Sequence, residues 1–288
     1  MSSWLITGAN RGFGLEIARA ALEAGDRVVA TARKPESIHA ALGRFGNRLA
    51  VVPLDVTDNE AISAAVDAAL ERFGRIDVLV NNAGYGQLGP FELVSPEAIA
   101  RQFSTNLFGA FALTRAVLPA MRSQRSGHIV NISSISGIKG FDGSSIYCAS
   151  KFALEGWSES LAGELAPFGI RTTLVEPGRF RTDFLDASSV SHGNFAIDDY
   201  ADYAARRKAE LDAANHRQAG DPVRLGRAIV ELTRAAHPPV RFAAGREAYD
   251  VLLERAGQLE AQAHAWADLS LSLDIDEPGP LANATRHA

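Results

Sequence analysis

The sequence has one cysteine, which excludes an internal disulfide and a cysteine-based metal site. Its seven histidines show no metal-ligand spacing. The net charge of −5 leaves no basic surface for nucleic acid. No apolar run approaches the roughly 20 residues that cross a bilayer, and the first residues lack the charged and apolar regions of a signal peptide. We therefore expect a cytoplasmic protein without metal, nucleic-acid or membrane partners.

The composition is that of a globular protein, 47% hydrophobic and 22% charged over 288 residues. Short apolar runs alternate with helical patterns, which is typical of an α/β protein with a parallel sheet. The expected strands lie at 3–7, 27–32, 48–54, 76–80, 127–133, 170–175 and 240–244. We find no internal repeat, low-complexity tract or clear linker, so we predict a single domain over residues 1–288.

A glycine-rich turn follows the first strand. Gly8, Gly12 and Gly14 stand between that strand and a helical apolar face that begins at Leu15. Glycines let the backbone approach a pyrophosphate closely, and the new helix presents unpaired N–H groups and a positive dipole end. The spacing G-x-x-x-G-x-G differs from the commoner G-x-G-x-x-G. A plain turn is the alternative, but the position between a strand and a helix favours phosphate binding.

The end of the second strand bears on the choice of nucleotide. An acidic residue there selects a free ribose 2′-hydroxyl, whereas an arginine accommodates a 2′-phosphate. Ala32 occupies the acidic position, Arg33 follows it, and Arg11 in the glycine turn faces the same region. The alternative is that both arginines are merely solvated. Two cations and no acid favour NADP(H), with NAD(H) as the main rival.

Further polar residues lie where expected strands or helices end. Asp55 follows the third strand and is either a loop acid or a contact of an adenine amino group. Thr57 begins a T-x-x-E capping box for the next helix. Asn82 follows the fourth strand, where open α/β sheets bind ligands. Asn106 lies at the edge of the apolar face of a long helix over 96–122, and a structural hydrogen bond there is as well supported as a functional role.

The stretch with the most chemistry runs from Ser134 to Lys151. Ser134 follows the fifth strand, Tyr147 comes thirteen residues later, and Lys151 follows Tyr147 at i+4. Residues four apart share a helix face, so the phenol and the ammonium point into the same space. A nearby positive charge lowers a tyrosine pKa, which suits proton transfer to a carbonyl oxygen. Taken alone, the pair is more often an ordinary surface Tyr and Lys.

In order along the chain, the segments T-G-x-x-x-G-x-G, D-V-T, N-N-A-G, a lone Asn, a Ser, Y-x-x-x-K and P-G-x-x-x-T resemble the short-chain dehydrogenase/reductase family. The resemblance covers roughly residues 3–182, with weaker support to 245. It implies a Rossmann-like three-layer α/β/α sandwich with a mostly parallel sheet of about seven strands. The A-T-A-R after the second strand is similar to the hydroxysteroid-dehydrogenase-like branch, which is often linked to NADP, but it does not identify a steroid substrate.

The same resemblance implies roles for the polar residues. Tyr147 would be the acid/base, Lys151 would lower its pKa and bind the nicotinamide ribose, and Ser134 would hydrogen-bond the substrate oxygen. Asn106 would hold a water that links Lys151 to solvent. With the two arginines included, the expected cofactor-binding residues are Gly8, Arg11, Gly12, Gly14, Arg33, Asp55, Val56, Asn82, Ala83, Gly84, Lys151, Pro177, Gly178, Phe180 and Thr182.

Two segments extend beyond the better-matched motifs. We expect residues 183–220 to form a substrate lid, and a C-terminal helical extension over about 246–275 to precede a loose tail from 276. The lid has apolar side chains that either line a substrate pocket or simply pack two helices together; they are Phe184, Leu185, Phe195, Ile197, Tyr200 and Tyr203.

These observations predict an NADP(H)-dependent oxidoreductase that interconverts a carbonyl and an alcohol by hydride transfer. The alternatives are an NAD(H)-dependent alcohol dehydrogenase of the same family and a non-catalytic dinucleotide sensor, which both Tyr147 and Lys151 argue against. The long helices near 96–122 and 145–166 would form the contacts of a homodimer or homotetramer. We expect Cys148, beside the tyrosine, to be a packing residue rather than a catalytic thiol.

Overall fold

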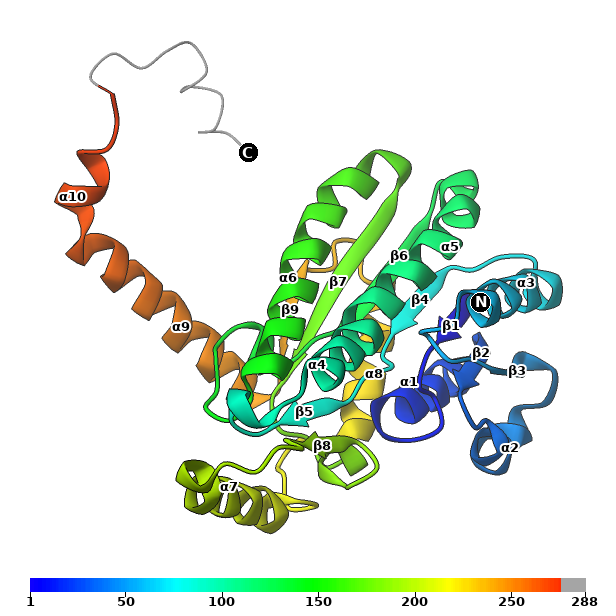
Figure 1. The fold of residues 1–288 in the computed structure, drawn as a ribbon. Helices are drawn as coiled ribbons and strands as arrows, with labels where there is room; N and C mark the ends of the chain where they lie inside the picture. The colour runs from blue at the N-terminus through cyan, green and yellow to red at the C-terminus, as the bar shows by residue number, and fades with distance from the viewer. Residues whose placement is uncertain (276–288) are drawn as a thin grey trace.

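A seven-stranded, fully parallel sheet forms the centre of the computed structural model, which describes residues 1–275 (Figure 1). The loose tail expected from residue 276 lies outside the described residues. Across the sheet the strands are β3 (Leu49–Pro53), β2 (Arg27–Ala32), β1 (Ser3–Ile6), β4 (Val78–Asn81), β6 (Gly127–Ile132), β7 (Ile170–Pro177) and β9 (Arg241–Ala244). All seven strands expected from the sequence are confirmed, with small differences at their ends.

Helices cover both faces of the sheet, as the three-layer expectation requires. One face packs against α1 (Gly12–Glu23), α2 (Glu36–Leu42) and α8 (Pro222–Arg234). The other packs against α3 (Asn59–Phe73), α5 (Gly109–Gln124) and α6 (Ser145–Leu165). Neighbouring strand residues face opposite layers, so that Ile6 joins the first core and Leu5 the second. Because both faces are buried, the strands are apolar throughout, which explains why they were visible in the sequence.

The strand order reverses beside β1. The chain runs from β1 outward through β2 to β3, and then crosses back to β4 on the opposite side of β1. In open parallel sheets, ligands bind outside the carboxyl ends of the strands at such a reversal. The glycine turn after β1 and the N-N-A-G segment after β4 therefore lie at the expected binding edge.

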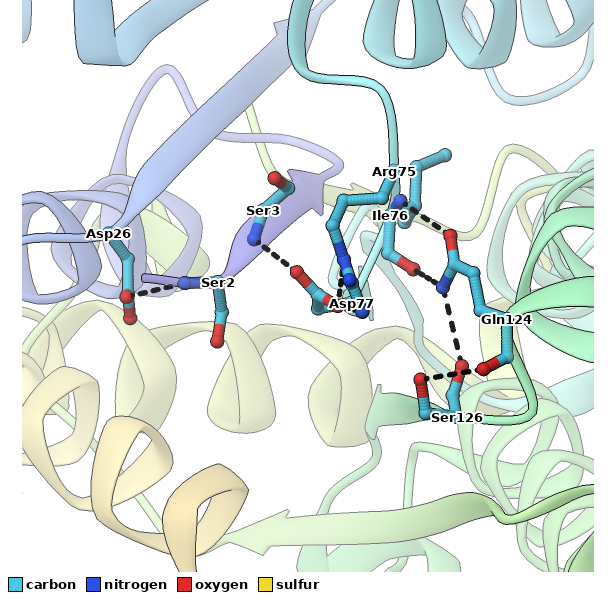
Figure 2. Close-up of polar contacts among 8 residues, drawn as sticks. All are labelled: Ser2, Ser3, Asp26, Arg75, Ile76, Asp77, Gln124 and Ser126. Carbon is cyan, nitrogen blue, oxygen red and sulfur yellow. Dashed lines mark hydrogen bonds and ion pairs between the residues drawn. The ribbon is translucent and has the colours of Figure 1, made fainter.

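Polar contacts hold the amino ends of β1 and β4, on the side of the sheet opposite to the glycine turn (Figure 2). The backbone N–H of Ser3 donates to the Asp77 carboxylate at 2.8 Å, and Arg75 donates to the same carboxylate at 2.7 Å. The Gln124 amide, at the end of α5, bonds both backbone groups of Ile76. These contacts join the amino ends of β1 and β4 to each other and to the end of α5.

The long helix expected over 96–122 is interrupted. Ser95 caps α4 (Pro96–Phe103), with Pro96 at its first position as the sequence predicts. A π-helical turn, η3 (Ser104–Phe108), then separates α4 from α5. Such turns insert an extra residue and are frequent at functional sites. Asn106 lies in this turn, and the sequence pattern had no signal for it.

The predicted capping box of α3 is wrong. Asp58, not Thr57, is the N-cap, and its carboxylate accepts from the backbone N–H groups of Glu60 and Ala61. Thr57 instead donates its backbone N–H and its hydroxyl to Asp55. A carboxylate one residue closer to the helix outcompetes the hydroxyl because it accepts two charge-assisted bonds at once.

The expected lid contains a helix where a polar helical pattern around Asp198–Asn215 predicts one, together with shorter elements before it. It comprises η6 (Asp183–Leu185), β8 (Val190–His192), η7 (Asp198–Tyr200) and α7 (Ala201–Ala214). β8 pairs in parallel with β5 (Gly86–Leu88) in a separate two-stranded sheet at one end of the molecule (Figure 1). The sequence predicted neither strand, because three-residue strands carry no periodicity.

The remaining elements are short turns and the C-terminal helices. The expected extension consists of α9 (Arg246–Ala265) and α10 (Ala267–Leu271). Short 3₁₀ turns occur at η1 (Gly43–Arg48), η2 (Phe91–Leu93), η4 (Ile135–Gly137) and η5 (Ala166–Phe168). Among residues 1–275, no helix combines the length and the apolar character that a membrane span requires.

Candidate active site

The glycine turn has a backbone that other residues would disturb. Gly8 and Gly12 adopt φ of 63° and 53°, in the left-handed region that favours glycine. A Cβ on Gly14 would lie 2.3 Å from the carbonyl oxygen of Gly8. The turn therefore packs against the start of α1 with no side chain between them, which leaves the helix N-terminus open to a phosphate.

Asn82 and Thr7 hold this turn against β4. The backbone N–H groups of Asn82 and Ala83 both donate to the Thr7 hydroxyl at 2.9 Å. The Asn82 amide donates to the carbonyl oxygens of Thr7, at 2.8 Å, and Gly8, at 3.2 Å. Asn82 thus holds the glycine turn in place through hydrogen bonds to its backbone. The sequence analysis did not predict this role of Thr7, although its position directly before Gly8 was a signal for it.

The expected adenine and ribose contacts lie along the ends of β2 and β3. Burial raises the pKa of the Asp55 carboxyl, but hydrogen bonds from Thr57 and the charge of Arg33 outweigh this effect and hold the pKa below its ordinary value. Arg33 itself is exposed and, within residues 1–275, forms no ion pair. Val56 lies under α5, where a Cβ on Gly109 would come within 2.8 Å of it.

Arg11 does not lie free in the glycine turn. Its guanidinium donates to the carbonyl oxygen of Ser188 at 3.0 Å, to the Ser189 hydroxyl at 2.7 Å and to the Ser188 hydroxyl. The sequence placed Arg11 beside Arg33 as a phosphate contact. In this structure Arg11 joins the glycine turn to the lid, across a separation of more than 170 residues that no sequence pattern could reveal, and its predicted phosphate contact stays a prediction.

The structure brings Ser134, Tyr147 and Lys151 together at the carboxyl end of β6. Tyr147 is 7% exposed, and the Lys151 Nζ lies 5.8 Å from the centre of its ring. The Lys151 ammonium donates to the carbonyl oxygen of Ile132 at 2.8 Å. The Ser134 hydroxyl accepts from the backbone N–H of Ser136 at 3.1 Å, which starts the η4 turn.

The protonation of these groups departs from the expectation in one respect. Burial raises the pKa of the Tyr147 phenol above its ordinary value, and a hydrogen bond with Ser134 lowers it only in part. The expected lowering by Lys151 is not among the causes of the shift. Burial also lowers the pKa of Lys151 to about 8, against the opposing charge of Glu155. Desolvation thus dominates at both residues.

Asn106 is buried and forms hydrogen bonds with both backbone groups of Tyr85. Its amide oxygen accepts from the N–H of Tyr85 at 3.1 Å, and its nitrogen donates to the Tyr85 carbonyl at 2.9 Å. It also borders a cavity of about 10 Å³ that Lys151 and Thr7 line. That volume is close to the space one water occupies. Asn106 therefore has the hydrogen bonds that a structural role requires. It also lies beside the same cavity as Lys151, as a functional role requires.

Downstream of β7, only some expected residues face the site. Thr182 lies across from the glycine turn, where a Cβ on Gly12 would be 3.7 Å from it. Its hydroxyl accepts from the N–H of Phe184 and starts η6. Phe180 instead packs edge-on against Phe13, at 5.2 Å between ring centres. Pro177 is buried, and Gly178 lies against Glu247, 3.0 Å from where its Cβ would be.

The lid covers Tyr147 with two of its six expected apolar residues. Phe184 lies 5.6 Å from the tyrosine ring, and Leu185 packs in the same cluster. Phe195 and Ile197 are 49% and 38% exposed. Tyr200 donates its hydroxyl to Glu92 and Tyr203 lies against Gly143, so both serve packing and surface contacts.

A cavity of about 230 Å³ opens beside this cluster. Leu88 and Leu211, which pack with Tyr147, also line the cavity. The cavity wall is completed by Gly89, Pro90, Leu93, Gly143, Ser144, His192, Gly193, Ala204, Ala205, Arg207 and Lys208. The lining is mainly apolar, and its charged side chains, Arg207 and Lys208, come from α7.

One potential ligand atom from each of Asp183, Asp186 and His216 lies within 4.8 Å of the other two. The Asp186 carboxylate accepts from Asn215 at 2.6 Å and is 3.0 Å from the His216 Nε2. These bonds account for the arrangement without an ion, and they fix the end of α7 to η6.

A doubly wound sheet with a glycine turn at its switch point, a buried Tyr147–Lys151 pair and a half-buried Ser134 has the architecture of a dinucleotide-dependent enzyme. The family model of the short chain dehydrogenase matches residues 3–191. The oxidoreductase BOA17 of Botryotinia fuckeliana is 38% identical over 93% of this chain and 98% of its own. The 3-ketodihydrosphingosine reductase of Bacteroides thetaiotaomicron is 40% identical over 84% and 87%. The chain belongs to the short-chain dehydrogenase/reductase family and is an oxidoreductase acting on CH–OH or carbonyl groups.

Solved structures agree with this assignment. A short-chain dehydrogenase from Streptomyces avermitilis has a TM-score of 0.87 and 39% identity, over 95% of this chain and 100% of that chain. A metagenomic short-chain oxidoreductase solved with NADP has a TM-score of 0.66 and 30% identity, over 84% and 95%. A reductase from Brucella melitensis, 26% identical with a TM-score of 0.68 over 81% and 90%, was solved with NADH. Both nicotinamide dinucleotides thus occur among these related structures. The alternative of a non-catalytic sensor is set aside, because the relatives are oxidoreductases.

Proposed function

We propose that this protein is an NADP(H)-dependent oxidoreductase that interconverts a carbonyl and an alcohol by hydride transfer, with Tyr147 as the acid/base. The observation that carries the proposal is the buried Tyr147 phenol, bonded to Ser134 and one helical turn from Lys151, at the sheet edge that also holds the glycine turn. Burial favours the protonated phenol, which is the form that gives a proton to a carbonyl oxygen during reduction.

The residues present fit a dinucleotide. The left-handed glycines and the close contact of Gly14 with Gly8 leave the backbone of the turn free to approach a pyrophosphate. The cofactor supplies the hydride when bound. The chain's own residues hold the substrate: the Ser134 hydroxyl bonds the substrate oxygen, and Tyr147 passes a proton to it in reduction or takes one in oxidation.

Lys151 has two tasks in this scheme. Its ammonium, which donates to the Ile132 carbonyl, would hold the nicotinamide ribose hydroxyls. The water-sized cavity between Lys151 and Asn106 offers a path by which Lys151 exchanges protons with solvent. The π turn at Ser104–Phe108 positions Asn106 for this purpose.

The preference for NADP(H) rests on Arg33. It is exposed, it has no ion pair within the described residues, and Ala32 before it leaves no carboxylate to bind a ribose 2′-hydroxyl. Arg11 serves as a second phosphate contact if it exchanges its bonds to Ser188 and Ser189 for the nucleotide. NAD(H) use is the rival within the family.

The cavity beside Tyr147 supports a substrate with an apolar carbon skeleton. Leu88, Leu93 and Leu211 contribute its apolar wall, and burial of such a skeleton contributes roughly 0.8 kcal/mol per CH₂. One relative is named a 3-ketodihydrosphingosine reductase. We infer that apolar ketones are the substrate class.

We also propose that the chain forms a homo-oligomer through α5 and α6. Phe108, the last residue of η3 just before α5, and Phe152, on α6, are 54% and 42% exposed. Sedimentation of wild type and a Phe152→Ser variant would show loss of the assembled species if these helices form the contact, and an unchanged mass would contradict it.

The main test is a screen of NADPH consumption over ketones, aldehydes, quinones and steroids, repeated with Tyr147→Phe. We expect turnover of an apolar ketone by the wild type and a loss of about 1,000-fold or more in the variant, because the proton donor is gone. NADPH binding measured by fluorescence should stay within about threefold. Near-normal turnover by Tyr147→Phe would contradict the assigned mechanism.

A further inference from the structure

The cavity in the proposed substrate wall has charge of one sign only. Its volume is about 230 Å³, and the largest apolar side chains that line it are those of Leu88, Leu93 and Leu211. The charged residues of its lining, Arg207 and Lys208, are both cations. In the part of the chain that the structure describes, no aspartate or glutamate lines this cavity. A ligand inside it would therefore meet apolar surface along most of its length and positive charge on the α7 side.

One face of α7 covers this cavity. Ala204, Lys208 and Leu211 all line it and are spaced by four and three residues, so they lie on the same side of the helix. None of the fourteen residues of α7 is buried, which distinguishes this helix from those that pack on the central sheet. A ligand with an apolar chain would give this face the apolar contacts that a surface helix usually makes with a core.

Arg207 is already held by the protein. Its guanidinium pairs with Glu210 and donates to the carbonyl oxygen of Asp142 at 3.3 Å. A Cβ on Gly143 would lie 3.6 Å from the Arg207 Nε. The segment that contains Asp142 and Gly143 leads directly into α6, which carries Tyr147. Arg207 therefore joins α7 to the start of α6, and these contacts use much of its hydrogen-bonding capacity.

Lys208 is the cation that a ligand can recruit. Its ammonium lies 2.6 Å from the carboxylate of Asp212, and the two side chains are 58% and 59% exposed. Ion pairs this exposed are weak, because water and salt screen them. The charge of Lys208 also reaches the cavity lining: burial lowers the pKa of His192, and Lys208 lowers it further, against the opposing charge of Asp212. An anion enclosed by the apolar wall would be screened less than Asp212 is.

We propose that the cavity binds an apolar oxo acid, whose ketone reacts at Tyr147 and whose carboxylate pairs with the Lys208 ammonium. A carboxylate carries the single negative charge that one ammonium matches. Leu88 and Leu211 connect the two ends of the site, since both line the cavity and pack with Tyr147. This inference rests on the proposed function and narrows its substrate class, with Lys208 as the specificity-determining residue. Its binding part does not depend on turnover.

Calorimetric titration with octanoate, methyl octanoate and octylamine tests the sign of the recognised charge, using the full chain with saturating NADP⁺ or NAD⁺. We expect octanoate to bind about tenfold more tightly than its methyl ester, because only the acid forms a charge-assisted contact. Octylamine, which is cationic, should bind more weakly than the ester. Lys208→Gln should reduce the affinity for octanoate by about tenfold and leave that for methyl octanoate within about twofold.

Arg206→Gln is the matched control for the loss of one positive charge from α7. Arg206 is next to the two cations of the lining, but it points elsewhere, with its guanidinium 5.6 Å from the ring centre of Tyr203. Its octanoate affinity should stay within about twofold of the wild type. Asp212→Asn should act in the opposite direction. It removes the carboxylate that competes for Lys208, so octanoate should bind about threefold more tightly.

Equal binding of octanoate and methyl octanoate by the wild type would overturn the proposal. Equal losses of octanoate affinity in Lys208→Gln and Arg206→Gln would also overturn it, because they would indicate the general field of α7 rather than a contact with Lys208.

Turnover of 7-oxooctanoate and its methyl ester separates this inference from the proposed function. We expect the wild type to favour the acid by about tenfold in kcat/KM, and Lys208→Gln to lose this preference while it still reduces the ester. Equal kcat/KM for the two ketones would overturn the oxo-acid substrate and support the proposed function. Selective octanoate binding without turnover of either ketone would contradict the proposed function and support the carboxylate site at Lys208.

Discussion

The two walls of the proposed active site are built in different ways. The cofactor wall, around the turn after β1, is mostly backbone: the left-handed glycines and the close approach of Gly14 to Gly8 set its shape, and the Asn82 amide holds it from the end of β4. The substrate wall, around Tyr147, is built from side chains of the lid, such as Phe184 and Leu211. The first wall depends on backbone conformation, and the second on how side chains pack.

The largest effect that tests this comparison should come from Gly14→Ala. The added Cβ would lie 2.3 Å from the Gly8 oxygen and cannot be absorbed by a flexible side chain. We expect dinucleotide binding to weaken by about 100-fold, equivalent to ~2.7 kcal/mol. Calorimetric titration with NADPH measures it.

Gly156→Ala is the matched control within a helix. Nothing lies within 4 Å of a Cβ at Gly156, so we expect unchanged binding and a gain of ~0.5 to 1 kcal/mol in the free energy of unfolding. Wild-type affinity in Gly14→Ala would show that the backbone approach does not define the cofactor wall.

The second test concerns charge on the cofactor wall. Arg33→Ala should weaken NADPH by about tenfold and NADH by less than twofold, because only NADPH carries the 2′-phosphate. Arg44→Ala removes another exposed arginine, one that already pairs with Glu23 at 3.1 Å, and should change neither affinity. Equal weakening of both nucleotides by Arg33→Ala would refute the NADP(H) preference.

The smallest expected effect belongs to the substrate wall. Phe184→Ala removes the ring 5.6 Å from Tyr147 and exposes the phenol to water. Burial raises the Tyr147 pKa, so exposure should lower it toward its ordinary value and move the loss of reductase activity to lower pH. The KM for an apolar ketone should rise about fivefold as apolar contact is lost.

Phe195→Ala provides the comparison for that experiment, since Phe195 is 49% exposed and lies on the same lid. Its pH profile and KM should match those of the wild type. If Phe195→Ala and Phe184→Ala behave alike, the lid acts as a whole and the specific contact with Tyr147 has no separate role.

The sequence was a reliable guide wherever a pattern has a short range. The seven strands were apparent because both faces of a parallel sheet are buried and apolar. Ser134, rather than Ser133, is predicted by its spacing from Tyr147, and a hydrogen bond with Ser134 lowers the pKa of the Tyr147 phenol in part. The cap at Thr57 was wrong because two adjacent residues competed for the same backbone groups, and Asp58 accepts two of them.

What the sequence by itself determined is the set of local structures and the order of the motifs, because strand burial, turn geometry and i+4 spacing are properties of neighbouring residues. Only the tertiary structure decided that Arg11 bonds the lid, that β5 pairs with β8, and that Arg241 brings Glu155 and Glu176 together. Those contacts join residues tens to hundreds of positions apart. Their energies depend on burial and on partners that no local pattern encodes.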